Sequence, residues 1–443
     1  MKIAIVGAGW AGCAAASQCT AHGMDVTLFD AAHLPGGRAR AVNDPQLGEL
    51  DNGQHLFIGA YYNTLELVRR DVGAKQIESS FKRLPLLLQS VGGQFCLKSH
   101  GGPNRSDLAD VVSLWRAKGL SLRDKWRITA LLHRLKTSPN TTDTDKRQAL
   151  SVSQWLEQER QTENARRWLW HPLCIATLNT EPEKACARLF EKVLRDSFLN
   201  RQAGATDLLI PSHNLSELWP STIASKVTTR WGHVVRAVVP QSHGVIIDGA
   251  RFDACVLAVP APNAARLVAP IDGFQTLVSQ LSQFEFRAIA TCYVSLADHE
   301  PLPAPLLMFD HAALDTSNRA QWVFDRTAFM SKTAHAQLSF VISCAEDLCK
   351  ADDLSLAQAL VEQLKRELPS YKGVAISARL FQEKRATFAA LPGMVRPTTT
   401  TPHQRIVLAG DWTDTGYPAV VEGAVLSGIK AADRLSAIAR DLS

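Results

Sequence analysis

The chain has 443 residues, and its 48 Lys and Arg against 43 Asp and Glu give a formal net charge of +5. Hydrophobic residues make up 46% and charged residues 21%, which is ordinary for soluble globular proteins and excludes a largely disordered or fibrous chain. The length suits two or three folding units, and the basic excess is too slight for a nucleic-acid footprint. We therefore expect a small-molecule enzyme or binding protein that has no nucleic-acid partner.

The nine cysteines are scattered and never spaced as CxxC. Disulfide frameworks belong to small secreted domains, and metal sites need closer pairing, so we expect reduced thiols, no metal and a cytoplasmic location. The sequence has no run of roughly 18 to 20 apolar residues that would span a bilayer. Any contact with a membrane is expected to be peripheral, on its inner face.

The first thirty residues have the pattern of a strand, a glycine-rich turn, a helix and a second strand. Residues 2–6 are apolar enough for a buried strand, an Ala-rich helix runs to about His22, and residues 25–29 form the next strand. The alternative is a secretory signal, with a positive end, an apolar run and small residues at a cleavage site. The regular spacing of the turn glycines favours a dinucleotide site.

Each part of this turn has a physical task in such a site. Gly7 permits the tight turn, Gly9 lets the backbone approach a pyrophosphate, and Gly12 lets helix and strand pack closely. Asp30, at the end of the second strand, can accept hydrogen bonds from ribose hydroxyls and would repel the 2′-phosphate of NADP. The same site includes two residues at the helix N-terminus: Trp10 and Ala11.

A second glycine pair follows Asp30. Gly36, Gly37 and Arg38 form a turn with a cation, and an ordinary surface turn would have the same composition. In this position the triplet resembles the second glycine signature of the flavin amine oxidase and phytoene desaturase superfamily. There the segment lies along the FAD pyrophosphate and isoalloxazine, so the resemblance implies FAD as the cofactor.

The C-terminal part has a matching pattern. Residues 405–411 have the composition of a buried strand that ends at Gly410 and Asp411, and a helix is predicted from about residue 419 to 438. The arrangement resembles the closing flavin motif of the same superfamily, in which the acid meets the ribityl or pyrophosphate part. The first turns of this helix contribute three further candidate cofactor residues: Val421, Glu422 and Ala424.

Three further strands are predicted in the middle of the chain, over residues 228–239, 244–248 and 251–260. A generic β-meander would have the same pattern. The segment also resembles the middle element of the flavin domain, which implies cofactor contacts from two pairs of residues: Val234 and Val235, and Ala258 and Pro260.

Between these segments, residues 106–200 have helical periodicity, and residues 284–296, 320–327, 337–344 and 373–382 alternate like strands of a mixed sheet. A helix that begins near Ser121 places Trp126, Ile128, Leu131, Leu132 and Leu135 on one apolar face. The predicted fold is α/β, with a Rossmann-like FAD-binding domain of the glutathione-reductase and amine oxidase type and an interleaved α+β substrate domain. The FAD domain is assigned to residues 1–85, 206–275 and 385–443, and the substrate domain to 86–205 and 276–384.

Residues 51–64, DNGQHLFIGAYYNT, carry the most specific likeness. They resemble the hydroxysqualene dehydroxylases, also called squalene-associated FAD-dependent desaturases, of bacterial hopanoid biosynthesis, and residues 172–180 and 410–418 support the likeness. The resemblance implies that hydroxysqualene loses water and gains hydride to give squalene, with a C30 isoprenoid as substrate. It also places Gly53, Gln54 and His55 beside the FAD.

The implied reaction needs a proton donor and an electron-rich surface near an allylic cation. His55 is the first candidate donor, because imidazole titrates near neutrality, and a structural histidine is the alternative. Asp51 is the second candidate, which would need a pKa raised by burial. Tyr61, Trp412 and Tyr417 could face the cation with their rings, although core packing would explain each of them and is favoured for Trp412. Asp414 could orient a donor, although capping of the following turn is favoured.

Tryptophans and basic residues gather in the helical region. Trp115 and Trp126 are two of six tryptophans between residues 115 and 219, and basic residues surround them. These side chains could line a hydrocarbon tunnel, touch an anionic membrane or simply pack between helices. A membrane surface and the upstream enzymes that produce hydroxysqualene are therefore the partners to consider.

Two other functions stay open at this point. One is a different flavin oxidoreductase, such as a carotenoid-type desaturase or an amine oxidase. The other is a non-enzymatic protein with an FAD fold that binds prenyl lipids.

Overall fold

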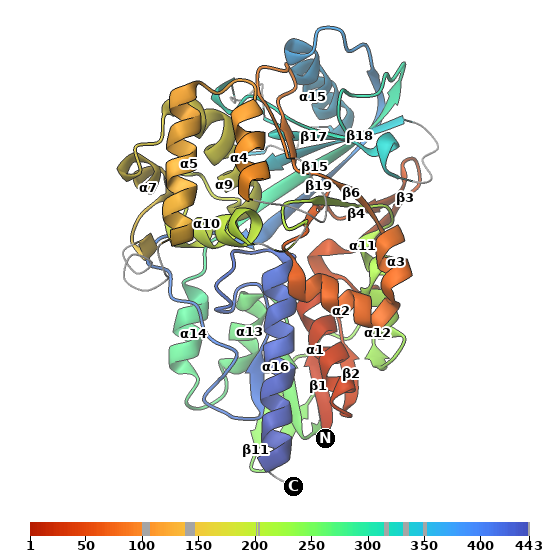
Figure 1. Cartoon of the computed structure of the whole chain (residues 1–443). Helices are drawn as coiled ribbons and strands as arrows, with labels where there is room; N and C mark the ends of the chain where they lie inside the picture. The colour runs from red at the N-terminus through yellow and green to blue at the C-terminus, as the bar shows by residue number, and fades with distance from the viewer. Residues whose placement is uncertain are drawn as a thin grey trace.

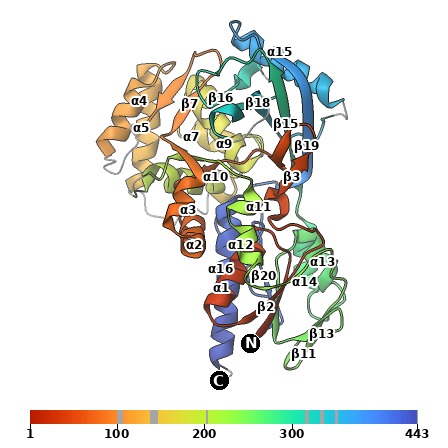
Figure 2. The same cartoon turned by 90° about the vertical axis from the view of Figure 1, so that its right-hand side faces the viewer.

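The computed structural model describes residues 1–99, 107–137, 147–200, 202, 204–313, 319–330, 336–348 and 352–441. The chain forms two lobes, and both termini lie at the far end of the lower lobe in Figure 1 and in the perpendicular view of Figure 2. No helix among the described residues is long and apolar enough to cross a membrane.

A five-stranded parallel sheet with the order β10-β2-β1-β14-β20 forms the centre of the lower lobe. Its strands are β1 (Lys2–Val6), β2 (Asp25–Phe29), β10 (Thr228–Arg230), β14 (Ala254–Leu257) and β20 (Ile406–Leu408). The three central strands, β2, β1 and β14, are buried almost throughout, as expected for parallel strands that are covered on both faces. Helices α1 (Trp10–Ala21) and α16 (Val421–Asp441) pack against each other beside the sheet (Figure 1). The predicted Rossmann-like architecture at both ends of the chain is confirmed.

The middle segment of the chain differs in detail from its prediction. Residues 228–239 are not one strand, because after β10 the backbone turns at Gly232, which has a φ of +65°, before β11 (Val238–Gln241) begins. Residues 251–260 are likewise divided, into β13 (Ala250–Phe252) and β14. Strands β11, β12 (Gly244–Ile247) and β13 form an antiparallel meander, whereas β14 joins the parallel sheet.

The upper lobe contains a second five-stranded sheet with the order β16-β17-β18-β15-β19. Its strands are β15 (Phe286–Ala297), β16 (Leu306–Met308), β17 (Trp322–Asp325), β18 (Ala336–Ser343) and β19 (Val374–Phe388). The prediction of a mixed sheet is wrong, since every pairing in it is antiparallel. Alternation of side chains reports which faces are buried and carries no information on strand direction. Helix α15 (Asp353–Glu367) packs against β19.

The predicted helical region is confirmed over the described part of residues 107–200. It consists of α4 (Asp107–Arg116), α5 (Leu122–Thr137), α7 (Val152–Gln158), α8 (Glu163–Ala165), α9 (His171–Leu178) and α10 (Ala187–Leu194), with π-helical segments at Arg166–Trp170 and Arg195–Leu199. In α5, Ile128, Leu131 and Leu135 are buried as predicted. Trp126 is instead 58% exposed, which corrects its assignment to the apolar face.

The remaining elements are shorter and are distributed over both lobes (Figures 1 and 2). The strands are β3 (Ala41–Asp44), β4 (Gly48–Asp51), β5 (Phe57–Ile58), β6 (Phe81–Leu84), β7 (Leu87–Gln89), β8 (Cys96–Lys98) and β9 (Leu208–Pro211). The helices are α2 (Tyr62–Val72), α3 (Ala74–Ser79), α11 (Leu215–Leu218), α12 (Pro220–Ala224), α13 (Ala261–Val268) and α14 (Gln275–Ser282). All strands of the parallel sheet come from the three segments assigned to the FAD domain, while the exact domain boundaries stay a prediction.

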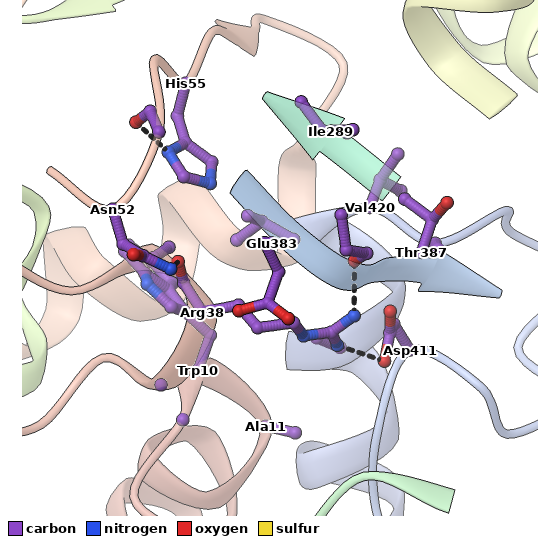
Figure 3. Close-up of a pocket in the computed structure, with 18 of the residues that line it drawn as sticks. Trp10, Ala11, Arg38, Asn52, His55, Ile289, Glu383, Thr387, Asp411 and Val420 are labelled. Carbon is purple, nitrogen blue, oxygen red and sulfur yellow. Dashed lines mark hydrogen bonds and ion pairs between the residues drawn. The ribbon is translucent and has the colours of Figure 1, made fainter. Parts of the chain in front are cut away.

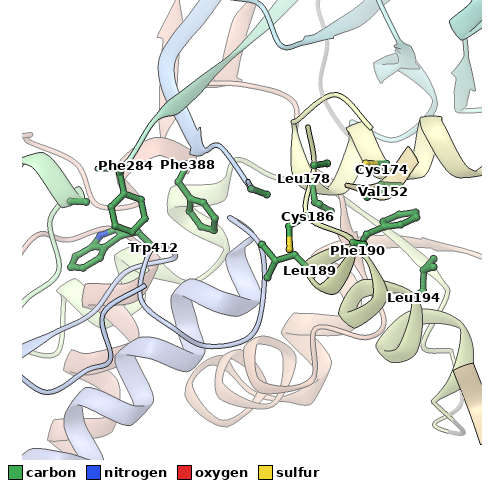
Figure 4. Close-up of a cluster of buried hydrophobic side chains, with 14 of the residues drawn as sticks. Val152, Cys174, Leu178, Cys186, Leu189, Phe190, Leu194, Phe284, Phe388 and Trp412 are labelled. Atoms are coloured by element: carbon green, nitrogen blue, oxygen red, sulfur yellow. The ribbon is translucent and has the colours of Figure 1, made fainter. Parts of the chain in front are cut away.

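One hydrophobic cluster connects the lobes (Figure 4). The ring of Phe284 lies edge-on to Phe388, with centroids 5.9 Å apart, and to Trp412, at 6.4 Å. The same cluster continues into α9 and α10 through Leu178 and Phe190. Because rings from three distant segments share this contact, the lobes are held together by apolar packing.

Replacing Phe388 by Ala tests whether this apolar cluster holds the lobes together. Phe388 is 1% exposed, and removal of a buried ring leaves a cavity, so we expect the free energy of unfolding to fall by about 3 to 5 kcal/mol. Val395→Ala is the control, because Val395 is 74% exposed and should change stability by less than about 0.5 kcal/mol. Urea unfolding of both variants measures the difference, and equal effects would show that the ring does not hold the lobes together.

Candidate functional site

A cavity of about 640 Å³ lies where the two lobes meet, and Figure 3 shows part of its wall. All but two of the predicted cofactor residues line it. They are Gly7, Gly9, Trp10, Ala11, Asp30, Gly36, Gly37, Arg38, Gly53, Gln54, His55, Val234, Val235, Ala258, Pro260, Gly410, Asp411, Val421 and Ala424. Gly12 and Glu422 are not part of the wall.

In the glycine turn between β1 and α1, the backbone lies very close to the residues that follow β14 and to the first turn of α1. Gly7 has a φ of +108°, and a Cβ added there would lie 2.5 Å from the carbonyl oxygen of Ala258. A Cβ on Gly12 would lie 1.8 Å from the oxygen of Gly7, so Gly12 acts in helix packing, the task assigned to it. Gly9 is the N-cap of α1 and offers no side-chain cap, which leaves the first N–H groups of the helix directed at the cavity.

The Asp30 carboxylate is held rigidly at the end of β2. It accepts hydrogen bonds from the backbone N–H groups of Ala8, at 2.6 Å, and Ala32, at 2.7 Å. Because both carboxylate oxygens are fixed and the residue lines the cavity, Asp30 presents a preoriented acceptor of the kind that binds ribose hydroxyls.

Arg38 and Asp411 join the two ends of the chain across the cavity wall. The Nη2 atom of Arg38 lies 2.6 Å from Oδ1 of Asp411, and its Nη1 donates to the backbone oxygen of Ala386 at 2.5 Å (Figure 3). Burial lowers the pKa of Arg38, but the charge of Asp411, its hydrogen bond and the charge of Glu383 together raise the pKa above its usual value. The pair therefore keeps a cation fixed beside the glycine turn.

The prediction that Glu422 contacts the cofactor is corrected by its hydrogen bonds. Its Oε1 accepts from the backbone N and Nδ2 of Asn63, and its Oε2 from the backbone N and Oγ1 of Thr64, at 2.7 to 3.0 Å. The side chain is fully buried, and Tyr61, the N-cap of α2, makes no side-chain cap. Glu422 thus caps α2, where a carboxylate also complements the helix dipole.

His55 faces the cavity in a defined tautomer. Its Nδ1 lies 2.8 Å from the backbone oxygen of Gly53, so Nδ1 carries the proton and Nε2 of the neutral ring is an acceptor (Figure 3). Burial lowers the pKa of His55 below 6.5, the Arg38 charge lowers it further, and the bond to Gly53 opposes both. The lowered pKa favours the neutral form of the His55 ring.

The loop that carries His55 is fixed from the upper lobe. The backbone N of Gln54 donates to Thr291 Oγ1 at 3.1 Å, and the Gln54 side-chain oxygen accepts from Ser339 at 3.0 Å. Thr291 is on β15 and Ser339 on β18, so the antiparallel sheet positions this loop of the cofactor wall.

Asp51 does not reach the cavity, which corrects its assignment as an alternative proton donor. Its Oδ1 accepts from the backbone N of Leu215 at 2.9 Å, at the start of α11. Burial raises the pKa of Asp51 to about 7, although the Leu215 bond and Arg326 act in the opposite direction. The raised pKa that a donor role would need is present, but Asp51 is not among the residues that line this cavity.

Asp414 and Tyr417 also lie outside the cavity wall. Asp414, whose side chain is half exposed, pairs with Arg396 at 3.3 Å. Tyr417 is buried beneath Lys192, with Nζ 4.6 Å from the ring centroid. Neither can face a ligand here, whereas Tyr61 does line the cavity and packs edge-on against Phe57 at 5.7 Å.

The sequence analysis missed Glu383, which lines the cavity from β19 (Figure 3). The predicted strand ends at residue 382, one position earlier, because the alternating pattern is interrupted by Glu383, Lys384 and Arg385. The strand in fact continues to Phe388. Continuation of the apolar pattern at residue 388 is the signal that would have included it.

The upper part of the cavity has a different character from the cofactor wall. It is lined by apolar side chains from α9, α10, β7 and the antiparallel sheet, namely Leu88, Leu173, Ile175, Phe190, Val193, Leu194, Leu306, Trp322, Phe324 and Val341. The cavity is therefore enclosed by two walls: the cofactor wall, formed by the predicted cofactor residues, and the hydrocarbon wall, formed by these apolar side chains.

The chain belongs to a known family of oxidoreductases. Residues 10–436 match the model of the flavin containing amine oxidoreductases. The glycine turn, the free helix N-terminus, Asp30 and the Arg38–Asp411 pair provide the donors, acceptors and space that an FAD needs. The protein is an FAD-dependent oxidoreductase, and these residues would hold the cofactor.

Several relatives are similar over their whole length. A hydroxysqualene dehydroxylase from Rhodopseudomonas palustris is 30% identical over 98% of each chain. A zeta-carotene desaturase from Synechocystis sp. is 23% identical over 99% of this chain and 97% of that one. The solved structure of cyclohexylamine oxidase from Brevibacterium oxydans has a TM-score of 0.66 and 16% identity over 99% of each chain, which shows the shared α/β fold.

A pair of glycine variants separates cofactor binding from folding. In Gly9→Ala the new Cβ has its nearest neighbour at 3.8 Å, so the apoprotein should fold normally but bind FAD at least about tenfold more weakly. In Gly12→Ala the Cβ collides with Gly7, so the thermal midpoint of the apoprotein should fall. Flavin fluorescence titration and thermal unfolding measure the two effects. Normal FAD affinity in Gly9→Ala would contradict the placement of the pyrophosphate.

Removal of the Glu422 carboxylate should destabilise the fold. In Glu422→Ala the buried donors of Asn63 and Thr64 lose their acceptors, and we expect the free energy of unfolding to fall by about 3 kcal/mol. Glu422→Gln keeps one acceptor oxygen and should lose less. If Glu422→Gln instead left stability unchanged and reduced FAD affinity, Glu422 would belong to the cofactor site after all.

Proposed function

We propose that this protein catalyses the FAD-dependent reductive dehydroxylation of hydroxysqualene to squalene in hopanoid and triterpenoid biosynthesis. The observation that carries the proposal is that the cofactor wall and the hydrocarbon wall belong to one and the same cavity. A C30 isoprenoid alcohol is apolar along its length and needs such a surface beside the flavin. The whole-length similarity to hydroxysqualene dehydroxylase from Rhodopseudomonas palustris supports this choice.

In the proposed reaction the substrate's C–O bond breaks, the oxygen leaves as water after it takes up a proton, and a hydride forms the new C–H bond. Bound FAD in its reduced form supplies that hydride. The chain's own side chains exclude water from the cation that forms, with Leu173, Phe190 and Trp322 in the hydrocarbon wall. Tyr61 offers an aromatic ring in the same cavity, which stabilises positive charge through its π face.

His55 is our candidate for the group that handles the proton, and Glu383 replaces Asp51 as the alternative. Both line the cavity, and Figure 3 draws both among the residues of its wall. Neutral His55 has Nε2 free to accept a hydrogen bond from the substrate hydroxyl. Protonated His55 would be a stronger acid than a solvated imidazolium, because burial disfavours its charge.

The reaction itself can be tested in one step. Holoprotein reduced with dithionite and incubated anaerobically with hydroxysqualene should form squalene in an amount stoichiometric with its flavin, detected by gas chromatography. Incubation of the oxidised protein is the control and should give none. Oxidation of a carotenoid or an amine, with no squalene formed, would replace the proposal by a desaturase or an amine oxidase.

The pH dependence identifies the proton donor. If His55 donates, the rate should fall as pH rises through its lowered pKa, so it should be higher at pH 5.5 than at pH 7.5. This slope should vanish in His55→Gln and persist in Glu383→Gln, while the flavin spectrum of both variants stays that of the wild type. A slope that instead vanishes only in Glu383→Gln assigns the proton to Glu383.

We further propose that the protein works in the cytoplasm and meets its apolar substrate at the inner face of the membrane. The eight cysteines in the described part of the chain are all free, which suits a reducing compartment. Squalene and its precursors dissolve in lipid rather than water, so an enzyme that uses them gains access at a bilayer surface.

A further inference from the structure

The hairpin formed by α4 and α5 carries a concentrated positive charge. The two helices and the turn between them, residues 107–137, contain seven Lys or Arg and three acids, for a net charge of +4 against +5 for the whole chain; from residue 112 onward the only acid is Asp124. Asp124 is 3% exposed and accepts hydrogen bonds from Ser121, Thr162 and Asn164, so it adds little negative charge at the surface. Of the neighbouring acids, Glu159 is paired with Arg134. The exposed face of the hairpin is therefore basic.

Large apolar side chains are exposed on the same hairpin. Val112 is 40%, Trp115 42%, Leu122 71% and Trp126 58% exposed, which makes four of the ten large exposed hydrophobic side chains in the described residues. Leu122 and Trp126 lie one turn apart on α5, and Lys125 ties α5 to the end of α4 by donating to the Trp115 backbone oxygen at 2.8 Å. The pair of helices forms the outer edge of the upper lobe in Figure 2. Indole rings among basic residues are typical of elements that lie at a lipid interface.

A second cavity, of about 200 Å³, begins under the same face. Leu122 and Trp126 continue at helical spacing into Thr129, His133 and Lys136, and these last three line the cavity. His133 and Lys136 are exposed, so the lining reaches the surface. The rest of the lining is mostly apolar and includes Leu97, Leu114, Ile128, Leu132 and Leu169.

The second cavity adjoins the main one. Leu86, Phe198 and Thr206 line both. An apolar path therefore leads from the exposed face of α5, between α4 and α5, to the hydrocarbon wall beside the flavin site.

We propose that the α4–α5 hairpin docks the protein on an anionic lipid surface, and that the second cavity is the passage by which a hydrocarbon chain moves from that surface into the main cavity. The proposal that the hairpin docks on lipid is supported by the exposed apolar side chains and the basic charge of the hairpin, and it does not depend on the proposed function. The proposal that the second cavity is a passage rests on the proposed function, because it assumes that the substrate is a long isoprenoid.

Vesicle sedimentation tests the docking without any turnover. Holoprotein should sediment with vesicles of phosphatidylglycerol and phosphatidylcholine, bind pure phosphatidylcholine vesicles far less, and be released by high salt. Leu122→Glu with Trp126→Glu should weaken binding at least about tenfold. Ile376→Glu with Val395→Glu is the matched control, since these two residues are also exposed and lie elsewhere.

The charge contribution has its own pair of variants. Lys118→Glu with Arg123→Glu should weaken binding to anionic vesicles by about tenfold or more. Lys430→Glu with Arg434→Glu, which makes the same charge change on exposed positions of α16, should not. The docking proposal would be overturned if both pairs lost binding equally or if the wild type did not bind vesicles. It would also be overturned if the wild type were a dimer that the Leu122 and Trp126 variant abolishes. The last result would assign the face to a second copy of the chain.

Leu132→Trp tests the passage by filling the second cavity. We expect the rate with hydroxysqualene in anionic vesicles to fall at least about tenfold, while vesicle binding and the flavin spectrum stay unchanged. An unchanged rate would overturn the passage. If neither the wild type nor the variant forms squalene, even from substrate in detergent micelles, the proposed function is wrong. The vesicle-binding measurements would still decide whether the hairpin docks on anionic lipid.

Discussion

The close contact between the β1–α1 turn and β14 is the constraint on which the cofactor site depends. Gly7 and Gly12 lie so near the backbone of Ala258 and of each other that neither position has room for a methyl group. This contact places the N-terminus of α1 at the edge of the parallel sheet, where its N–H groups meet the cavity. It also fixes β14 beside β1, and β20 pairs with β14 in turn. Segments that are hundreds of residues apart are thereby brought to one wall, and Arg38 and Asp411 close it with opposite charges.

The second lobe supplies what the first cannot. A parallel sheet edge offers backbone donors and carboxylates, which suit a nucleotide but give no dry surface for a hydrocarbon. The antiparallel sheet and the helices α9 and α10 contribute that surface, and Thr291 and Ser339 of the sheet also hold the Gln54 loop. Because the apolar cluster around Phe284, Phe388 and Trp412 connects the lobes, the two walls are kept at a fixed separation.

How far the sequence predicts this site depends on whether a residue's position follows from local spacing or from packing between distant segments. The glycines, Asp30 and Asp411 follow from local spacing, because turn geometry needs particular residues at fixed offsets. Glu422 and Asp51 are in segments next to the site, yet their carboxylates turn toward helix N-termini on the other side, which only the packed structure decides. Glu383 is the opposite case, since its strand continues through three charged residues that interrupt the alternating pattern. Strand direction in the second sheet and the break at Gly232 were also beyond the sequence, because both depend on contacts between distant segments.

A dry cavity makes the placement of charge costly, and this governs how a proton can reach the substrate. A carboxylate or imidazolium resting beside hydrocarbon would lose its hydration, so resting groups there tend to be neutral. His55 follows this rule: burial and Arg38 lower its pKa, while Gly53 fixes its tautomer. The same lowering that makes imidazolium scarce makes it a stronger acid when it forms, which is what the proposed loss of water from an allylic alcohol would need. In the reaction proposed above, the cation would meet neutral rings and aliphatic side chains, while the charges of Arg38 and Asp411 are already paired with each other. Because such a wall excludes water, a hydride would be the partner that neutralises that cation.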